Sequence, residues 1–336
     1  MLFELPSFQH IDATDVREAV SYLDRYGEKA KVIAGATDLL SLMKDRIEGP
    51  ELKIPDVLVN IKKIPELNVM TFKKGKGLSI GAAVTLSQLA TSDVLKQKFS
   101  ILSQAALHVG TTQLRNMGTV GGNLCQRPRC AYFRHPHFVC FKKGGIRCYA
   151  AAGEHRFYHS IMMQGKCVMA HPSDMAPALM ALEAKAVIAT SDEERRIPLA
   201  EFFTGPNSFK ETALDPGELL VAFEIPDQNG MHQVFIKQRI RHAADFALSS
   251  VAVSARVTKG VCEDIKVLLG GVAPVPYVVA ELEDMIKGRR LNEQLVSQAA
   301  DVAVKEARPL PMNGYKVDLT KALVKRALTT MMEPPM

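Results

Sequence analysis

Hydrophobic positions in the first half of the chain switch repeatedly between helical and strand spacing. Over residues 14–26 they recur every three or four positions, which predicts a helix with one buried face, and Thr14 or Asp12 can cap its start. Short apolar runs predict strands at residues 31–34, 57–61, 69–72, 78–82, 167–170 and 186–189, and helical spacing recurs at residues 86–95, 101–109 and 173–182. The first half is therefore expected to mix helices and strands.

The pattern loosens around residues 204–208, and we place a domain boundary near residue 210. Beyond it, apolar runs predict strands at residues 218–225, 233–238, 248–257 and 264–272, followed by helices at 277–288, 292–306 and 316–331. The expected fold class is α+β. A first domain spans residues 1–210, with subdomains of about 1–56 and 57–210, and residues 211–336 form an antiparallel sheet with helices.

Two stretches of small residues are candidate ligand sites. Gly118, Gly121 and Gly122 lie within five residues, among threonines and asparagines. Glycine lets backbone N–H groups approach a ligand, and successive N–H groups form an anion-binding nest, so this stretch suits a phosphate, although an ordinary glycine turn is the alternative. The second stretch, at residues 35–38, joins a predicted strand to a helix start, where a pyrophosphate or a plain connection fits. Neither has the G-x-G-x-x-G spacing of the Rossmann fold.

Five of the six cysteines lie within 43 residues, in the spacing C-x4-C-x9-C-x7-C-x18-C. Such clustering is typical of a metal site rather than of core packing. The spacing lacks the C-x2-C-x2-C run of ferredoxins and the paired short knuckles of zinc sites, so iron–sulfur and zinc both remain open from the residues alone.

Charge and hydropathy limit the expected binding partners and the expected cellular compartment. The net charge is +6, and its main concentration lies among the cysteines, at Arg127, Arg129, Arg134, Lys142, Lys143 and Arg147. We attribute it to compensation of an anionic cluster rather than to nucleic-acid binding, because basic tails and aromatic-interleaved basic stripes are absent from the sequence. The sequence has no apolar run of about 18 residues and no recognisable secretion signal, so we expect no membrane span and a reducing, cytoplasmic setting.

Three motifs together resemble one known family. They are Ala-Gly-Ala-Thr-Asp-Leu-Leu at residues 34–40, Arg-Asn-x-Gly-Thr-Val-Gly-Gly-Asn-Leu at 115–124 and Pro-Ser-Asp at 172–174. They are similar to the FAD-binding medium subunit of the molybdenum hydroxylases, the xanthine dehydrogenase and carbon monoxide dehydrogenase family. The likeness continues at residues 217–220, 235–238 and 270–274, and so covers nearly the whole chain in order.

The resemblance implies a two-lobed FAD-binding domain of the vanillyl-alcohol-oxidase type, followed by a C-terminal domain of the CO dehydrogenase flavoprotein type. It implies that both small-residue stretches hold the FAD pyrophosphate. The implied FAD-binding residues are Ile33, Ala34, Gly35, Ala36, Thr37, Asp38, Leu39, Leu40, Val109, Gly110, Thr111, Asn116, Gly118, Thr119, Gly121, Gly122, Asn123, Asp174, Leu220 and Lys237. Ala36 stands where many relatives have a second glycine, and we expect FAD binding to tolerate its methyl group.

The cysteine-rich segment, at about residues 124–167, resembles an insert in the branch of 4-hydroxybenzoyl-CoA reductase and the periplasmic-type aldehyde oxidoreductases. In that branch the flavin subunit carries an additional [4Fe–4S] cluster. Mapped by this resemblance, the ligands are Cys130, Cys140, Cys148 and Cys167, and Cys125 is a small apolar residue beside the flavin turn.

The resemblance implies an oxidoreductase, specifically an electron-transfer flavoprotein subunit with FAD and a [4Fe–4S] cluster and without acid–base catalytic residues of its own. Implied partners are a molybdopterin-binding large subunit, a [2Fe–2S] small subunit, in a heterotrimer or its dimer, and an external carrier such as ferredoxin or NAD. Two alternatives are a stand-alone FAD oxidase or dehydrogenase of the vanillyl-alcohol oxidase type and a non-catalytic zinc scaffold.

Overall fold

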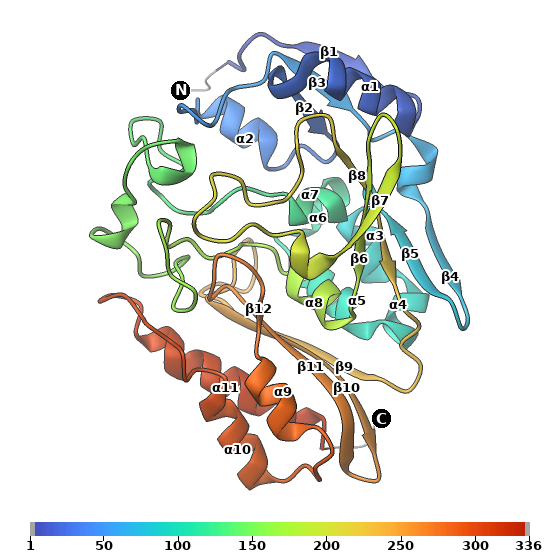
Figure 1. Ribbon diagram of the computed structural model, residues 1–336, viewed down its shortest axis with the longest axis vertical. Helices are drawn as coiled ribbons and strands as arrows, with labels where there is room; N and C mark the ends of the chain where they lie inside the picture. The colour runs from blue at the N-terminus through green and yellow to red at the C-terminus, as the bar shows by residue number, and fades with distance from the viewer. Residues whose placement is uncertain (1–3, 333–336) are drawn as a thin grey trace.

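Residues 4–332 are described by a computed structural model, in which three separate sheets lie one below another (Figure 1). The N-terminal lobe, at the top, holds a parallel sheet in the order β1-β3-β2 with two helices beside it. Its elements are β1 (Gln9–Asp12), α1 (Val16–Tyr26), β2 (Ala30–Ile33), α2 (Leu39–Lys44) and β3 (Val57–Asn60). Asp15 caps α1 by accepting a 2.8 Å hydrogen bond from the Glu18 N–H, so the expected caps Thr14 and Asp12 are wrong.

The middle sheet has the order β4-β5-β8-β6-β7, and every neighbouring pair is antiparallel. Its strands are β4 (Met70–Lys73), β5 (Gly77–Gly81), β6 (Lys185–Ala189), β7 (Glu194–Pro198) and β8 (Leu219–Ile225). The helices of this lobe are α3 (Leu86–Thr91), α4 (Asp93–Lys98), α5 (Ser100–Leu107), α6 (Thr112–Met117), α7 (Val120–Leu124) and α8 (Met175–Ala181).

The central strands of this sheet are buried on both faces, which explains the apolar runs of β6 and β8. Ile188 packs into the core shared with the helices of the middle lobe, whereas its neighbour Val187 packs into the core shared with α1. Alternate side chains of a strand point to opposite faces, so each strand contributes to two cores. The sheet thereby fixes the N-terminal lobe against the helices that follow.

Three local predictions are wrong. The strand expected at 218–225, assigned to the C-terminal sheet because it follows residue 210, is β8 and pairs with β5 and β6. Spacing identifies a strand but not its partner. The helix expected at 86–95 is broken at Ser92, which caps α4 instead. Residues 167–170 form only a single bridge, between His159 and Met169, and no strand.

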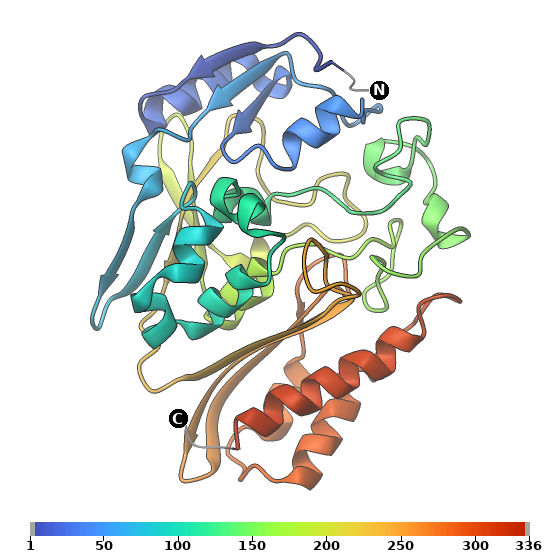
Figure 2. The same ribbon diagram turned by 180° about the vertical axis from the view of Figure 1, so that it is seen from behind.

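The C-terminal unit is an antiparallel sheet in the order β12-β11-β10-β9, covered by three helices (Figure 2). Its elements are β9 (His232–Gln238), β10 (Ser249–Thr258), β11 (Val261–Gly270), β12 (Tyr277–Val278), α9 (Ala280–Ile286), α10 (Glu293–Val302) and α11 (Tyr315–Thr330). The three expected helices are confirmed. Within residues 4–332, no helix combines the length and apolar character that a membrane span requires.

Lys316, at the start of α11, ties this unit to the cysteine-rich segment. Its fully buried ammonium donates to the carbonyl oxygens of Phe157, His159 and Gly271, at 3.1, 2.8 and 2.6 Å. Burial lowers the pKa of Lys316 to about 7. One side chain therefore joins α11, the end of the cysteine-rich segment and the turn after β11.

The buried ring of His159 makes a pH-dependent contribution to stability. The residue is 5% exposed, and neither ring nitrogen has a hydrogen-bond partner within the described part of the chain. Burial lowers its pKa to about 4, whereas an unfolded histidine titrates near 6.5. The unfolded state therefore binds the extra proton first, and stability is lost as the pH falls from about 6.5 to about 4.

We expect His159→Phe to remove most of this loss, which is worth about 3 kcal/mol. Urea unfolding at pH 7 and pH 4.5 checks this, because the difference between the two pH values should be smaller for the variant than for the wild type. Equal differences in the two proteins would contradict it.

Candidate flavin and cysteine sites

The two small-residue turns expected to hold a diphosphate touch each other. A Cβ atom added to Gly35 would stand 2.2 Å from the carbonyl oxygen of Met117 and 2.8 Å from the Cα of Gly118. Only glycine permits this approach of one backbone to the other. The turn after β2 and the stretch around α6 and α7 are thus brought together from distant parts of the sequence.

The second stretch is not an open loop, because it folds into the short helices α6 and α7. Thr111 and Thr119 cap them, each side chain accepting from the N–H three residues further on, at 3.3 and 3.2 Å. The Gly121 N–H donates to the Ala82 carbonyl at 2.9 Å, which pins the stretch to the end of β5. Capping residues and glycines at these positions leave little side-chain bulk around the backbone.

Ala36 sits at the centre of the first turn with a φ of 62°, in the left-handed region. A residue with a Cβ atom pays about 1 kcal/mol or more for this conformation, and glycine does not. The conformation, in addition to the methyl group, distinguishes this turn from one with a second glycine. The tolerance of FAD binding for Ala36 stays a prediction.

Asp174 and Lys237 form a buried ion pair. Their charged atoms are 2.6 Å apart and the side chains are 5% and 0% exposed. Lys237 also donates to the carbonyl oxygens of His108 and Asp245, both at 3.0 Å. Burial raises the pKa of Asp174 and the Lys237 charge opposes that rise. The pair joins α8, β9 and the segment that leads into α6.

Two further predicted flavin residues, Asn123 and Leu220, lie in α7 and in the adjoining core. Asn123 is buried and accepts a 2.6 Å hydrogen bond from the Ser173 hydroxyl, directly before Asp174. Leu220 is buried in β8, in the hydrophobic core that also contains Val120. The roles of the individual residues toward FAD stay predictions.

Four of the clustered cysteines line one cavity. Cys130, Cys140, Cys148 and Cys167 line it, together with aromatic residues and Lys142. The cysteine-rich segment has little regular structure. It lies between the N-terminal lobe and the C-terminal unit (Figure 1). All four cysteines are free thiols, and only Cys148 is more than marginally exposed.

The fifth and sixth cysteines lie elsewhere. Cys125 packs against the core of the middle lobe, and burial raises its pKa to about 12, while Cys262 is buried in the core of the C-terminal unit. Within the cavity, the hydrogen bond from Cys167 lowers the pKa of the Cys148 thiol to about 6. The four cavity thiols are those expected as cluster ligands, and Cys125 is the one expected to be spare.

Across residues 4–332, no three His, Cys, Asp or Glu side chains gather tightly enough around one point to hold a single metal ion. The four thiols face a shared space instead. The predicted [4Fe–4S] cluster and its ligand set therefore stay predictions.

Sequence reasoning missed the carboxylates that pair with the basic residues of the cysteine-rich segment. Arg127 and Lys142 contact the buried Glu211 at 2.8 and 3.4 Å, and Arg129 and Arg134 contact Asp38. Four of the six basic residues are thus paired with carboxylates of this chain. An anionic cluster is not needed to account for the charge of these four. The sequence shows the cluster of basic residues. No motif around Glu211, which lies in another segment, indicates that it pairs with them.

Comparison with known proteins agrees with this architecture. Residues 6–228 match the model of the FAD binding domain in molybdopterin dehydrogenase, and residues 235–331 match that of the CO dehydrogenase flavoprotein C-terminal domain. The aldehyde oxidoreductase FAD-binding subunit PaoB of Escherichia coli strain K12 is 34% identical over 303 residues, covering 89% of this chain and 90% of that protein. The glyceraldehyde dehydrogenase medium chain of Sulfolobus acidocaldarius is 27% identical, covering 96% and 97%.

Among solved structures, carbon monoxide dehydrogenase from Hydrogenophaga pseudoflava aligns with a TM-score of 0.77 at 25% identity, covering 97% of this chain and 98% of that one. The chain thus combines an FAD-binding domain with a CO dehydrogenase flavoprotein C-terminal domain. This combination places it in the class of flavoprotein subunits of oxidoreductases. Within that class, the chain belongs to the family of FAD-binding medium subunits of the molybdenum hydroxylases. The predicted family, fold class and FAD cofactor are confirmed at this level.

Proposed function

We propose that this chain is the electron-transfer subunit of a molybdenum-containing hydroxylase or dehydrogenase complex, and that it carries a [4Fe–4S] cluster in addition to FAD. One observation carries the second part: four cysteines separated by up to 37 residues in sequence line a single cavity. The proposed ligands are Cys130, Cys140, Cys148 and Cys167.

The flavin part of the proposal rests on the joined turns. The glycines at positions 35, 121 and 122 keep both stretches free of side-chain bulk, which suits close approach of the FAD diphosphate, and the buried pair Asp174–Lys237 joins α8 to β9 nearby. Bound FAD supplies the ability to exchange electrons in pairs or singly. The residues of this chain bind and orient it, and none is needed as an acid or base for electron transfer.

Two features support a cluster over a zinc ion. Across the described residues no group of three His, Cys, Asp or Glu side chains is arranged to hold a single metal ion, although four thiols line one cavity. Lys143 is fully buried, its ammonium donates to the His135 carbonyl at 2.8 Å, and no carboxylate of the described residues pairs with it. A buried cation needs a counter-charge, and a cluster held by four thiolates supplies one.

The proposed partners are a molybdopterin-binding large subunit, a [2Fe–2S] small subunit and an external carrier such as ferredoxin or NAD. The names of the relatives support this, because they are medium chains or FAD-binding subunits of dehydrogenases and an oxidoreductase. The free thiols fit a reducing compartment, in line with the proposed cytoplasmic location.

The test is to purify the full chain, with any subunits that accompany it, without oxygen, and to record its absorption spectrum and its flavin and iron content. We expect flavin bands with a broad visible shoulder, and about one FAD and about four irons per chain. Flavin bands alone would overturn the cluster and favour a stand-alone flavoenzyme. A colourless protein with zinc would overturn both parts.

A further inference from the structure

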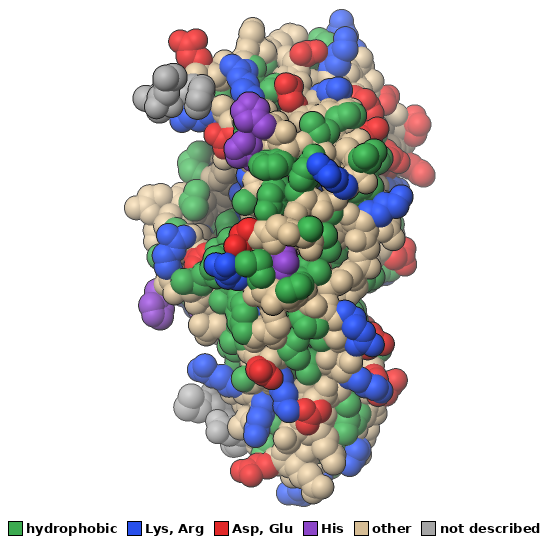
Figure 3. Space-filling model, turned by 90° about the vertical axis from the view of Figure 1, so that its left-hand side faces the viewer, with side chains coloured by type: hydrophobic (Ala, Val, Ile, Leu, Met, Phe, Trp, Pro, Cys, Tyr) green, Lys and Arg blue, Asp and Glu red, His purple; other side chains and the backbone are tan. Residues whose placement is uncertain are grey.

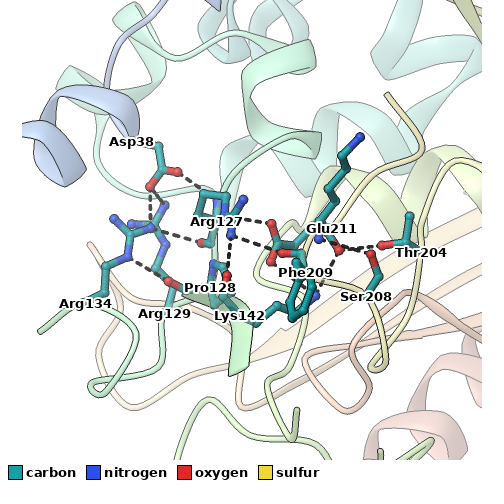
Figure 4. Close-up of polar contacts among 11 residues, drawn as sticks. Asp38, Arg127, Pro128, Arg129, Arg134, Lys142, Thr204, Ser208, Phe209 and Glu211 are labelled. Carbon is teal, nitrogen blue, oxygen red and sulfur yellow. Dashed lines mark hydrogen bonds and ion pairs between the residues drawn. The ribbon is translucent and has the colours of Figure 1, made fainter. Parts of the chain in front are cut away.

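The carboxylate of Asp38 binds the cysteine-rich segment at three points (Figure 4). Its oxygen atoms accept from the Arg129 guanidinium at 2.7 Å, the Arg134 guanidinium at 2.6 Å and the Arg127 backbone N–H at 2.9 Å. The Asp38 side chain is 17% exposed, and the two guanidiniums are similarly covered. The two arginines are the main influences that lower the pKa of Asp38, against the opposing effect of burial, so the carboxyl is ionised.

These contacts link the two proposed cofactor sites. Asp38 belongs to the turn that contacts the second flavin stretch at Gly35, and it lies two residues after the strained Ala36. Arg129 immediately precedes Cys130, and the Arg134 N–H donates to the Cys130 carbonyl at 3.0 Å. The segment that presents the first proposed cluster ligand is therefore held by the flavin turn.

A second carboxylate fixes the other end of the same segment. Glu211 contacts Arg127 and Lys142, and Lys142 lines the cysteine cavity two residues after Cys140. Figure 4 shows Arg127 between the two carboxylates, with its backbone N–H bonded to Asp38 and its guanidinium paired with Glu211. Of the two carboxylates, Asp38 is the one that belongs to a proposed flavin turn.

Ion pairs and hydrogen bonds, such as those made by Asp38, Glu211 and Lys316, hold the cysteine-rich segment, and regular structure contributes little. The segment contains only two short turns of 3-10 helix, Phe141–Lys143 and Tyr149–Ala151, and its hydrophobic cluster around the cysteines is small. In Figure 3, hydrophobic side chains cover the middle of the face on which this segment lies, with basic and acidic side chains around them. A segment with little regular structure gains order from each cofactor or ion pair that fixes it.

We propose that Asp38 is a positioning residue that couples the two sites, so that FAD and the cluster each strengthen the binding of the other. The proposal rests on the proposed function, because it needs a cluster in the cysteine cavity. FAD fixes the turn that carries Asp38, the ion pairs fix the segment that carries Cys130, and the cluster fixes that segment from the other side. Coupling of this kind is reciprocal.

The test measures the dissociation constant of FAD, by flavin fluorescence without oxygen, for the full chain with its cluster and after removal of iron with an oxidant and a chelator. For the wild type we expect removal of the cluster to weaken FAD binding about tenfold. For Asp38→Asn we expect weak binding in both forms, with less than a twofold difference. A merely structural loss would weaken both forms and leave the tenfold difference in place.

A second, kinetic readout is the rate at which iron is lost in air. Because FAD would order the segment that carries Cys130, saturating FAD should slow this loss about tenfold in the wild type and leave it unchanged in Asp38→Asn. Glu224→Gln is the matched control, because it removes the carboxylate of an exposed ion pair with Arg196 on the middle sheet and should keep the full coupling. If Asp38→Asn fails to fold, Arg129→Gln is the alternative, because it removes one of the two ion pairs of Asp38 by changing the arginine. This variant should reduce the coupling.

Coupling that persists in these variants would overturn the proposal, and so would a wild type that holds both cofactors without influence of one on the other. A wild type that binds FAD and never holds four irons would overturn the proposed cluster, and the coupling with it. The iron assay on the wild type separates these two failures.

Discussion

Gly35→Ala should weaken FAD binding about 5- to 150-fold, the range that corresponds to an overpacking cost of about 1–3 kcal/mol. The new methyl carbon would stand 2.2 Å from the Met117 carbonyl oxygen, so one of the two turns has to move. The obstacle is backbone, which cannot rotate away as the end of a flexible side chain can. If both turns bind the diphosphate, their separation removes contacts from both at once. Fluorescence titration of the iron-containing chain with FAD measures the effect.

Gly314→Ala is the matched control. A Cβ atom at Gly314 meets nothing within 4 Å, and its φ of −57° suits any residue. We expect this variant to bind FAD as the wild type does. Thermal unfolding of both variants separates a local effect on the turn from a loss of folding. A Gly35→Ala chain that is folded and binds FAD within twofold of the wild type would contradict the assignment of the paired turns to FAD.

The elements that the sequence predicted well are those whose signal is local. The C-terminal helices follow from apolar spacing, and the strand, turn and helix start at residues 30–44 follow from an apolar run, small residues and renewed helical spacing. Local spacing says nothing about which strand lies beside which. For that reason β8 was recognised as a strand and assigned to the wrong sheet, because its partners β5 and β6 lie far away in the chain.

The same distinction between local and tertiary information applies to the candidate sites. The clustering of the cysteines was visible, but the placing of Cys125 in a core and of four others around a cavity depends on tertiary packing. The acidic partners of the arginines could not be predicted, because Asp38 and Glu211 lie 91 and 82 residues from Arg129. The sequence of the turn predicts Asp38 as a flavin residue. Its side chain, however, contacts the cysteine-rich segment.

Cys140→Ser should abolish the cluster and reduce the iron content from about four per chain to a background level. A serine hydroxyl is a poor replacement for a thiolate as an iron ligand, and three remaining cysteines leave one iron without a protein ligand. FAD should remain bound when it is supplied in excess, because the flavin turns lie outside the cavity and retain their own contacts with each other. Iron analysis and the visible spectrum, recorded on protein purified without oxygen, measure both parts.

Cys125→Ser provides the comparison that makes this result specific. Cys125 lies only five residues before Cys130, yet it packs into the core of the middle lobe, whereas Cys130 lines the cavity with Cys140. If the ligands are the four cavity thiols, Cys125→Ser keeps both FAD and iron. If Cys125→Ser loses iron and Cys130→Ser keeps it, Cys125 replaces Cys130 in the ligand set. If Cys140→Ser keeps its full iron content, the cavity does not hold a cluster through Cys140.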